Sequence, residues 1–297
     1  AFCNTHKYDI IHVNGGTGID ISYALAAKSG NPKAKVVMHS HADNVEPPKI
    51  MIKKMAHYIF RVFLKNVPDA YLACSASSLK WMFGELSNSY KKYEVLLNGI
   101  DIDQYKFDET TRKNLRQKLG IDRKLVLGTV GRLEPQKNPV FILDLIEKIL
   151  KVRQDISFIW IGEGSLLDWT KQEAETREIS RYIEFVGATD EVNKYYQAMD
   201  VFVLPSVYEG LGIVNIEAQC TGLKCMVSNV VPREARISDL VKFLPIDDAQ
   251  RWADIIVNIQ NSYKRVDQRK QAKEYGYGQF ETARKLYSFY IELLNEK

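Results

Sequence analysis

Residues 205–218 of the chain read PSVYEGLGIVNIEA, and they place two carboxylates, Glu209 and Glu217, eight positions apart. The preceding residues 201–204 (VFVL) form a short apolar run that predicts a buried strand, and a helix is expected from Ile213. A strand that leads into a helix N-terminus presents unsatisfied N–H groups and the positive end of the helix dipole, which favour an anion such as phosphate. The two acids need another partner, and the hydroxyl groups of a sugar or ribose suit them.

A second element earlier in the chain has the same form. Residues 126–131 (VLGTVG) predict a strand that runs into the loop 132–139 (RLEPQKNP), and a helix is expected to follow. Arg132 and Lys137 therefore leave the sheet together, at the strand end where open α/β sheets bind ligands. Two cations placed there suit a diphosphate, although solvated loop cations are the simpler alternative.

Apolar strands alternate with longer helical periods along the whole chain, which predicts parallel sheets built from βα units and thus an α/β fold. We expect strands at residues 8–13, 35–40, 70–74, 94–97, 125–130, 157–161, 183–186, 201–204, 224–228 and 241–244, and a long C-terminal helix at 268–294.

Taken in order, these motifs resemble those of the retaining family-four glycosyltransferases, which have the GT-B fold. The resemblance rests on GR-x3-QKNP from Gly131, on PS-x2-EG from Pro205, and on the E-x7-E spacing of Glu209 and Glu217. Further matches are DIIHV (9–13), LNGID (97–101), IGEG (161–164) and FVG (185–187). The segments EAQ (217–219) and PREA (232–235) are most similar to enzymes of exopolysaccharide and capsule assembly.

The resemblance implies roles for particular residues. Arg132 and Lys137 would stabilise the charge that a departing diphosphate gains. Glu209 would lie near the donor sugar and Glu217 would bind the ribose hydroxyls; neither is expected to be a nucleophile, and the alternative for each acid is a helix-dipole partner. The expected catalytic residues are Glu209, Arg132, Lys137 and His39. The expected donor-binding residues are Gly131, Gly162, Val186, Gly187, Ser206, Gly210, Gly212, Ile213, Val214 and Glu217.

His39 ends a predicted strand in the run HSHAD (39–43), and a relative's histidine at this strand end points at the donor sugar. A structural or solvated histidine is the plainer alternative. The His-x-His pattern with His41 also raises a metal site, but no third ligand is evident, so we expect no metal and no cofactor.

The 297 residues suggest two domains at about 150 residues each. The resemblance implies that both are Rossmann-like: residues 1–107 as a partial N-terminal, acceptor-side domain and residues 108–297 as the nucleotide-sugar domain. Relatives place several strands and helices ahead of the first predicted strand, and the chain has no initiator Met. We therefore expect a fragment with an incomplete N-terminal domain, whose own activity stays in question.

The composition of the chain argues against several classes of partner and ligand. With 45% hydrophobic and 26% charged residues the chain is typical of a globular protein, and a net charge of +4 gives no nucleic-acid footprint. The four cysteines have no metal-like spacing and are expected to be reduced thiols, which favours the cytoplasm. The run GGTG (15–18) fails the dinucleotide fingerprint, which speaks against an NAD-dependent oxidoreductase.

Five residues repeat at four-residue spacing: Lys49, Lys53, His57, Arg61 and Lys65. This stripe predicts a basic amphipathic helix over 49–65, which suits contact with anionic lipid at the inner face of the cell membrane. The alternative is a solvated basic face opposite an apolar, core-facing one.

The sequence thus predicts a retaining hexosyltransferase of exopolysaccharide or capsule assembly. It would move sugar from a nucleoside diphosphate sugar, with UDP as the expected carrier, to a glycan or lipid-linked acceptor. A nucleotide-sugar 2-epimerase and a non-catalytic partner subunit with the same fold are the alternatives.

Overall fold

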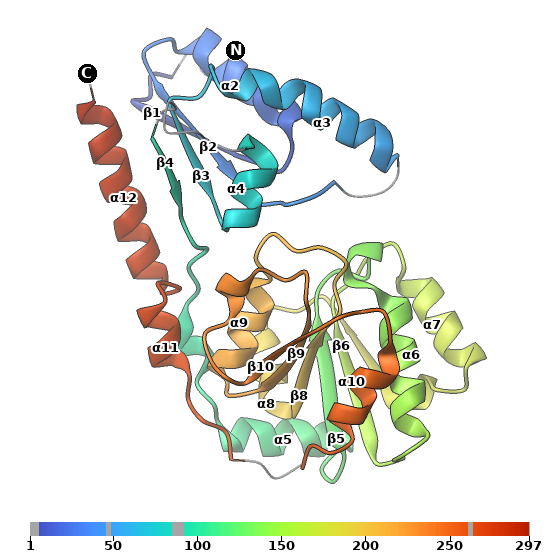
Figure 1. Ribbon diagram of the computed structural model, residues 1–297. Helices are drawn as coiled ribbons and strands as arrows, with labels where there is room; N and C mark the ends of the chain where they lie inside the picture. Colours follow the sequence, from blue (N-terminus) through green and yellow to red (C-terminus); the bar gives the residue numbers. More distant parts are fainter. Residues whose placement is uncertain (1–5, 46–48, 85–91, 261–263, 297) are drawn as a thin grey trace. The chain divides into compact units, whose positions relative to one another are not determined.

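The computed structural model describes residues 6–45, 49–84, 92–260 and 264–296 (Figure 1). The chain forms two compact units. Unit 1 comprises Ala1–Ile100, Tyr208–Leu211 and Gly276–Lys297, and unit 2 comprises Asp101–Val207 and Gly212–Tyr275. The first boundary, after Ile100, lies seven residues before the boundary that the sequence predicted after residue 107. The C-terminal segment from Gly276, which was predicted to belong to the second domain, belongs to unit 1.

Unit 1 contains a parallel sheet in the order β1-β2-β3-β4. Its elements are β1 (Ile10–Gly15), α2 (Ile21–Gly30), β2 (Lys35–Ser40), α3 (Ile50–Leu64), β3 (Ala70–Ala73), α4 (Ala76–Phe83), β4 (Tyr93–Val95) and α12 (Gln279–Asn295).

Alternate residues of the unit 1 sheet enter two different cores, because successive strand side chains point to opposite faces. Val36 and Met38 pack with residues of α2 and α4. Val37, between them, packs on the other face with Phe289 and Leu293 of α12. The sheet is thus a middle layer between α12 and the N-terminal helices (Figure 1).

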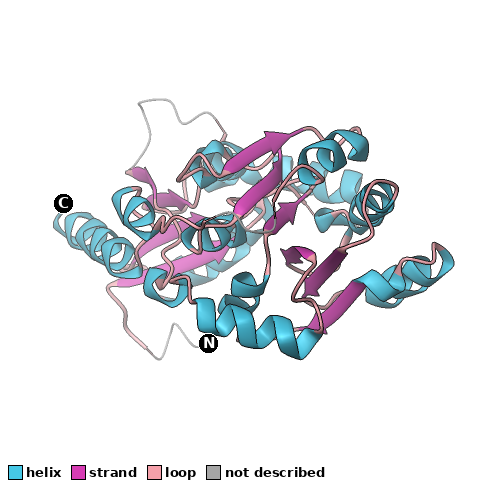
Figure 2. Cartoon of the chain, turned by 90° about the horizontal axis from the view of Figure 1, so that it is seen from below, coloured by secondary structure: helices cyan, strands magenta, loops and turns pink. Residues whose placement is uncertain are grey.

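Unit 2 has a larger parallel sheet in the order β10-β9-β8-β5-β6-β7. Its strands are β5 (Leu125–Val130), β6 (Ile156–Ile161), β7 (Ile183–Gly187), β8 (Val201–Leu204), β9 (Lys224–Ser228) and β10 (Val241–Leu244). Its helices are α5 (Glu109–Leu119), α6 (Pro139–Leu150), α7 (Leu167–Thr176), α8 (Val192–Ala198), α9 (Ile213–Cys220), α10 (Ala249–Ile256) and α11 (Arg269–Glu274). Figure 2 shows helices lying around the strands of the sheets.

The strand order of unit 2 reverses between β5 and β8. From β5 the chain adds β6 and β7 on one side, and then returns to add β8, β9 and β10 on the other. At such a reversal the loops after the two central strands diverge and open a crevice outside their carboxyl ends, where open α/β sheets bind ligands. In this unit those loops are 131–138 and, as far as Val207, the loop that follows β8.

A buried network of charged side chains lies at the amino end of β8 in unit 2. Asp200, just before β8, is paired with Arg112 at 2.5 Å and Arg116 at 3.1 Å, and its Oδ2 accepts from Val126 N at 2.8 Å. The Asp200 side chain is 2% exposed. The charged groups are compensated in place, as buried charges must be.

Each predicted strand overlaps a strand of the structure, with ends that agree to within about two residues, but the predicted C-terminal helix is wrong in one respect. Residues 268–294 form two helices, α11 and α12, instead of one. The break contains Gly276, whose φ of +88° lies outside the range of a right-handed helix. Ile100 N then donates to Tyr277 O at 2.8 Å, which fixes the turn within unit 1.

Candidate functional site

The loop after β5 places both predicted cations at the β5–β8 reversal. Gly131 and Arg132 follow β5 directly, and Lys137 ends a short 3-10 turn, Pro135–Lys137. The Lys137 side chain lies across Gly131: a Cβ at position 131 would be 2.8 Å from Lys137 Cε. Gly131, with φ +153°, is thus required for the lysine to lie close to the main chain.

The loop after β6 packs on this loop through its backbone. A Cβ at Gly162 would lie 2.1 Å from Gly131 O, and Gly162 N donates to Gly187 O at 2.8 Å. Gly131, Gly162 and Gly187 therefore bring the ends of β5, β6 and β7 into direct main-chain proximity. Val186, also predicted as a site residue, is half-buried in β7.

The loop after β8 is tied to the β5 loop. Val207 N donates to Gln136 O at 2.9 Å, immediately before Lys137. Ser206 is fully buried beside this bond. The two motifs singled out in the sequence are thus joined by a main-chain hydrogen bond within unit 2.

Helix α9 begins at the same edge. Gly212 caps its N-terminus with φ +78° and has no side chain to accept from the first-turn amides. Ile213 and Val214 form that first turn and are half-buried. These first-turn N–H groups point out of the helix at the positive end of its dipole, and the cap offers them no side-chain acceptor. An anion can therefore bind to them.

Glu217 lies one turn further along α9 and is held by two tyrosines. Tyr196 OH donates to Glu217 Oε2 at 3.0 Å, and the Tyr105 phenol lies close enough to stabilise the charged carboxylate. Burial raises the pKa of Glu217, and the two phenols oppose that rise by stabilising the charged form. A carboxylate with one side fixed by phenols has lone pairs left to accept from a diol.

Segment 208–211, which contains Glu209, belongs to unit 1. Gly210 O accepts from Ser75 Oγ at 2.6 Å and from Ser78 Oγ at 3.2 Å, at the N-terminus of α4. A Cβ on Gly210 would lie 2.5 Å from His41 O, so the segment runs against the loop after β2. Glu209 is 6% exposed.

Two further polar groups lie near this segment. His39, at the end of β2, is 6% exposed, and its Nε2 has no hydrogen-bond partner among the described residues. Burial raises the pKa of Asp43 to about 7, and the nearby charge of Glu209 adds to the rise. Asp43 therefore lies within electrostatic reach of Glu209, and the His39 ring lies beside that of His41, with centroids 4.1 Å apart.

The predicted site residues therefore fall into two groups. The structure brings Gly131, Arg132, Lys137, Gly162, Val186, Gly187, Ser206, Gly212, Ile213, Val214 and Glu217 to the strand-end edge of unit 2, and it places His39, Glu209 and Gly210 in unit 1. Their roles in binding stay predictions. The sequence analysis missed Tyr105, Tyr196, Ser75, Ser78 and Asp43. Only Ser75 had a local signal, since a serine after a strand and before a helix commonly caps that helix.

In helix α3 the basic stripe that was expected to face a membrane or solvent is partly buried. His57 is fully buried: its Nδ1 accepts from Gly18 N at 2.9 Å and its ring stacks on Trp81. Lys53 and Arg61 are half-buried. The apolar side chains of α3 instead face outward, with Met51, Ile52, Met55, Ile59, Val62 and Phe63 each more than half exposed.

Cys74, Cys220 and Cys225 are free, buried thiols, as expected; Cys3 lies outside the described residues. Within the described ranges, no group of three or more His, Cys, Asp or Glu side chains is placed to hold a metal ion. Nor does any described helix combine the length and apolar content that crossing a membrane requires.

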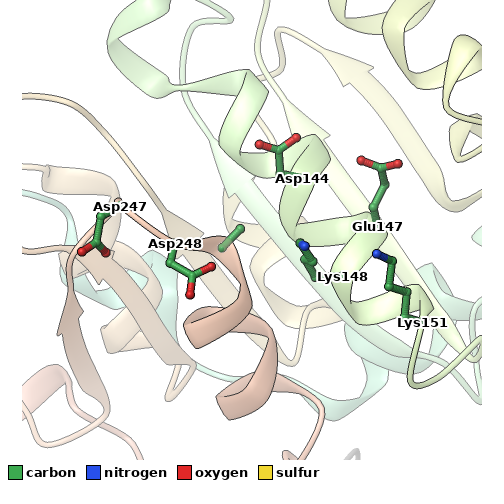
Figure 3. A pocket seen from close by; sticks show the side chains of 7 residues that line it. Asp144, Glu147, Lys148, Lys151, Asp247 and Asp248 are labelled. Carbon is green, nitrogen blue, oxygen red and sulfur yellow. The ribbon is translucent and has the colours of Figure 1, made fainter.

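An open hollow of about 400 Å³ lies elsewhere on unit 2, between α6 and α10 (Figure 3). It is lined by Asp144, Glu147, Lys148, Lys151, Asp247, Asp248 and Ala249, none of which is a predicted site residue. Asp144 and Glu147 are already paired with Arg177, at 2.6 and 2.9 Å. The hollow is thus a charged surface groove whose acids are partly neutralised.

Comparison with known proteins agrees with this geometry. The family model described as "Glycosyl transferases group 1" matches residues 111–279. The UDP-Gal:alpha-D-GlcNAc-diphosphoundecaprenol alpha-1,3-galactosyltransferase of Escherichia coli is 30% identical over 230 residues, covering 75% of this chain and 58% of the relative. The putative glycosyltransferase EpsF of Bacillus subtilis is 25% identical over 236 residues, covering 78% of this chain and 61% of the relative. The chain thus spans about three fifths of the length of these two relatives.

Among solved structures, Anabaena Alr3699/HepE in complex with UDP superimposes with a TM-score of 0.77 over 95% of this chain and 78% of that one, at 19% identity. Sucrose-phosphate synthase from Thermosynechococcus elongatus gives a TM-score of 0.75 at 17% identity, covering 98% of this chain and 75% of that one. The α/β fold with two Rossmann-like parallel sheets is therefore confirmed.

Proposed function

Because the chain belongs to the glycosyl transferases of group 1, we propose that it carries the donor-binding part of a retaining hexosyltransferase that uses a UDP-sugar. The sugar would pass to a glycan or lipid-linked acceptor in exopolysaccharide or capsule assembly, in the cytoplasm. The observation that carries the proposal is the convergence at the β5–β8 reversal of unit 2, where a cationic loop, the bare N-terminus of α9 and Glu217 share one edge.

Each group at this edge suits one part of a nucleoside diphosphate. Arg132 and Lys137 supply positive charge for the two phosphates, whose negative charge increases as the sugar leaves. The first-turn amides of α9 add hydrogen-bond donors for a phosphate, and these donors do not change with pH because backbone amides do not titrate. Glu217, fixed by Tyr196, has acceptor capacity for the two ribose hydroxyls.

Two relatives support the choice of donor and acceptor. The E. coli relative is named for a UDP-galactose donor and a diphosphoundecaprenol-linked acceptor, and the Anabaena structure holds UDP. Retention of configuration and metal independence are part of the proposal through the resemblance of the motifs.

The decisive test is calorimetric titration of the chain with UDP, GDP and ADP. We expect saturable binding of UDP, at least tenfold weaker in Lys137→Ala and weaker in Glu217→Ala. Lys151→Ala, which removes an exposed cation on the same unit, is the matched control and should bind as the parent does.

The outcomes separate the alternatives. If the chain binds GDP or ADP more tightly than UDP, the nucleotide of the donor is that one and not UDP. UDP binding together with C2 epimerisation of a UDP-sugar would favour the epimerase. A failure to bind any of the three nucleotides would contradict the donor site, and a tight complex with another transferase would then favour a non-catalytic subunit.

We further propose that α3 of unit 1 contacts an anionic membrane through its outward apolar face. Met51 is 84% exposed and Met55 is 61% exposed, so the face has the apolar character of an interfacial helix. Residues 50–68 contain no Asp or Glu, whereas Lys53, Lys54 and Arg61 flank the face. This one-sided charge complements anionic lipid and gives no complement to a second copy of the same helix.

Sedimentation with phosphatidylglycerol vesicles tests this surface. Binding should exceed that to phosphatidylcholine vesicles, weaken with salt, and fall at least tenfold when Ile52, Met55 and Ile59 are replaced by Ser. Val152→Ser, at a position 64% exposed in unit 2, is the control. Equal binding to both lipids, or loss of a dimer instead of loss of vesicle binding in the triple variant, would contradict the proposal.

A further inference from the structure

The loop after β5 contains an acid between its two cations. The main chain of Glu134 is bonded to both cationic residues: Glu134 N donates to Arg132 O at 2.8 Å, and Lys137 N donates to Glu134 O at 2.9 Å. The position of Glu134 therefore determines where both cationic residues leave the loop. A negative charge beside a proposed diphosphate site opposes the binding of an anion, so the acid must contribute in some way other than through its charge.

The Glu134 side chain is bonded to the loop after β6, the neighbouring strand of the sheet. Its Oε1 accepts from Ser165 N at 2.8 Å, and its Oε2 accepts from Ser165 Oγ at 2.7 Å. Both carboxylate oxygens thus bind one residue of that loop, and hydrogen bonds to a charged group are among the stronger ones in proteins. These two bonds lower the pKa of Glu134, and the charge of Arg132 adds a smaller effect, so the side chain is a carboxylate at neutral pH.

The main chains of the two loops meet at the same place. Leu133 N donates to Glu163 O at 3.0 Å, and Leu166 N donates to Leu133 O at 2.9 Å. A Cβ at Gly164 would lie 2.5 Å from Leu133 O, so a larger residue there would push the loops apart. The loop after β6 thus supports the cationic loop along its length, and the carboxylate bonds are the side-chain part of that support.

We propose that Glu134 and Ser165 are positioning residues for the diphosphate, because their paired hydrogen bonds hold the β5 loop with Arg132 and Lys137 arranged before the nucleotide binds. All four residues belong to unit 2. The inference rests on the proposed function for its ligand, whereas the effect of the pair on the loop does not. A loop that is ordered in advance loses less conformational entropy on binding, and this gain offsets the unfavourable charge of Glu134.

Two substitutions of Glu134 separate its charge from its hydrogen bonds. Glu134→Gln removes the charge, but its amide can still accept from Ser165 N and donate to Ser165 Oγ. Glu134→Ala removes the charge and both bonds. In calorimetric titration with UDP, we expect Glu134→Gln to bind no more weakly than the parent and Glu134→Ala to bind about fivefold more weakly than Glu134→Gln. Glu175→Ala, which removes an exposed acid of α7, is the control and should bind UDP as the parent does.

The sign of the change decides the role of the acid, because the loss of a negative charge by itself favours an anion. Tighter binding of UDP in both Glu134 variants would overturn the proposal, since the acid would then act through its charge alone. Equal affinity of the two variants would also overturn it, because the loop would keep its form without the hydrogen bonds.

Ser165→Ala tests the other half of the pair. It removes Oγ and keeps the main-chain N–H, so we expect UDP binding to weaken about two- to threefold, with no further loss when Ser165→Ala is combined with Glu134→Ala. A further loss of the same size in the double variant would overturn the pairing, because the two residues would then act independently.

Uridine, which lacks both phosphates, is the matched ligand. Measured by ligand-observed NMR, its affinity should be the same in Glu134→Ala and in the parent, because the pair acts on the residues that bind phosphate. An equal loss of affinity for uridine and for UDP would overturn the positioning role, since a general distortion of unit 2 has that effect.

Hydrogen exchange in the ligand-free chain tests the loop without any nucleotide. The amides of residues 131–138 should exchange about threefold faster in Glu134→Ala than in Glu134→Gln, whereas those of α10 should not change. Unchanged exchange of the loop would overturn the proposal. A parent chain that fails to bind UDP would instead contradict the proposed function, and the exchange result would still decide whether the pair holds the loop.

Discussion

In unit 2 the candidate ligand groups are held mainly by the main chain, through bonds such as Val207 N to Gln136 O at 2.9 Å and through the approach of Gly162 to Gly131. In unit 1 the corresponding groups are held by side chains: His39 by His12, His12 by Tyr290, and the Gly210 carbonyl by Ser75. The two units therefore differ in what can disturb them. Main-chain contacts respond to an added Cβ, whereas the hydrogen bonds of His12 and His39 respond to a proton.

The distribution of histidine sharpens this difference. All five histidines of the chain lie within its first 57 residues, and thus in unit 1. Of these, His12, His39, His41 and His57 have lowered pKa values because burial opposes their charged forms. Unit 2 instead places its buried charges in a compensated arginine–aspartate network.

The largest expected effect is on that network. Asp200→Ala leaves Arg112 and Arg116 without their buried partner and removes the acceptor of Val126 N. We expect the free energy of unfolding to fall by about 3–5 kcal/mol, measured by urea denaturation. Asp239→Ala removes an acid whose side chain is 99% exposed, and should cost less than about 0.5 kcal/mol. Equal losses would mean that the network is not buried as described.

Next is the main-chain contact between loops. Gly162→Ala places a Cβ 2.1 Å from Gly131 O at a φ of +133°, so we expect a loss of about 2–4 kcal/mol in unfolding free energy. Gly120→Ala is matched, because φ is +65° there but nothing lies within 4 Å of the new Cβ; it should cost only about 1 kcal/mol. A small effect at position 162, similar to that at 120, would show that the loops yield and would weaken the contrast between the units.

A pH series should then separate the units. His12, His39 and His57 are neutral when folded but take up protons near pH 6.5 when unfolded, so their contribution is complete above pH 6.5 and is lost as pH falls towards 4. Burial also lowers the pKa of His41, which adds to this loss. Asp43, with its pKa raised to about 7, acts in the opposite direction and offsets roughly one histidine. We expect unit 1 to lose about 2 kcal/mol between pH 6.5 and 5.5.

Hydrogen exchange by mass spectrometry measures this, because it follows the β1–β3 amides of unit 1 and the β5–β6 amides of unit 2 in one sample. Faster exchange in the first set alone is the expected result. A parallel change in both sets would contradict a pH response confined to unit 1.

The smallest effect concerns Glu217. Tyr196→Phe removes a hydrogen bond to its carboxylate and should weaken UDP binding about tenfold, or about 1.4 kcal/mol, in the calorimetric assay. Tyr182→Phe, whose phenol pairs with Gln154, serves as the control and should bind UDP normally. Unchanged affinity in Tyr196→Phe would show that the ribose acceptor is fixed without the phenol.

Much of the fold could be predicted because its signals are local. The runs at 35–40, 125–130, 201–204, 224–228 and 241–244 coincide with β2, β5, β8, β9 and β10, since each is apolar and bounded by turn or helix residues. The order of motifs also placed Arg132 and Lys137 in the loop after one strand, and Glu217 in the helix that follows another. The strand order that makes these ends neighbours depends on pairing between distant segments, which no local pattern encodes.

The groups that hold the candidate residues could not be predicted for the same reason. Tyr290 and His12 are 278 positions apart, and Tyr196 of α8 meets Glu217 of α9 across 21 positions. Helix α3 shows a different failure. Its four-residue basic repeat predicted a basic face turned to an anionic membrane or to solvent. His57 instead accepts from the buried Gly18 amide, and the apolar residues of the helix face outward.

Each unit contains at least one buried free cysteine whose rate of chemical modification measures how often that unit opens. Cys74 lies in unit 1 and Cys220 and Cys225 lie in unit 2, and burial raises the pKa of all three thiols, so that reagents reach them only when the surrounding structure opens. With Cys3 replaced by Ser, the rate of alkylation at each site therefore reports the opening of one unit without any introduced label. Under mild acid, Cys74 should be modified before the other two.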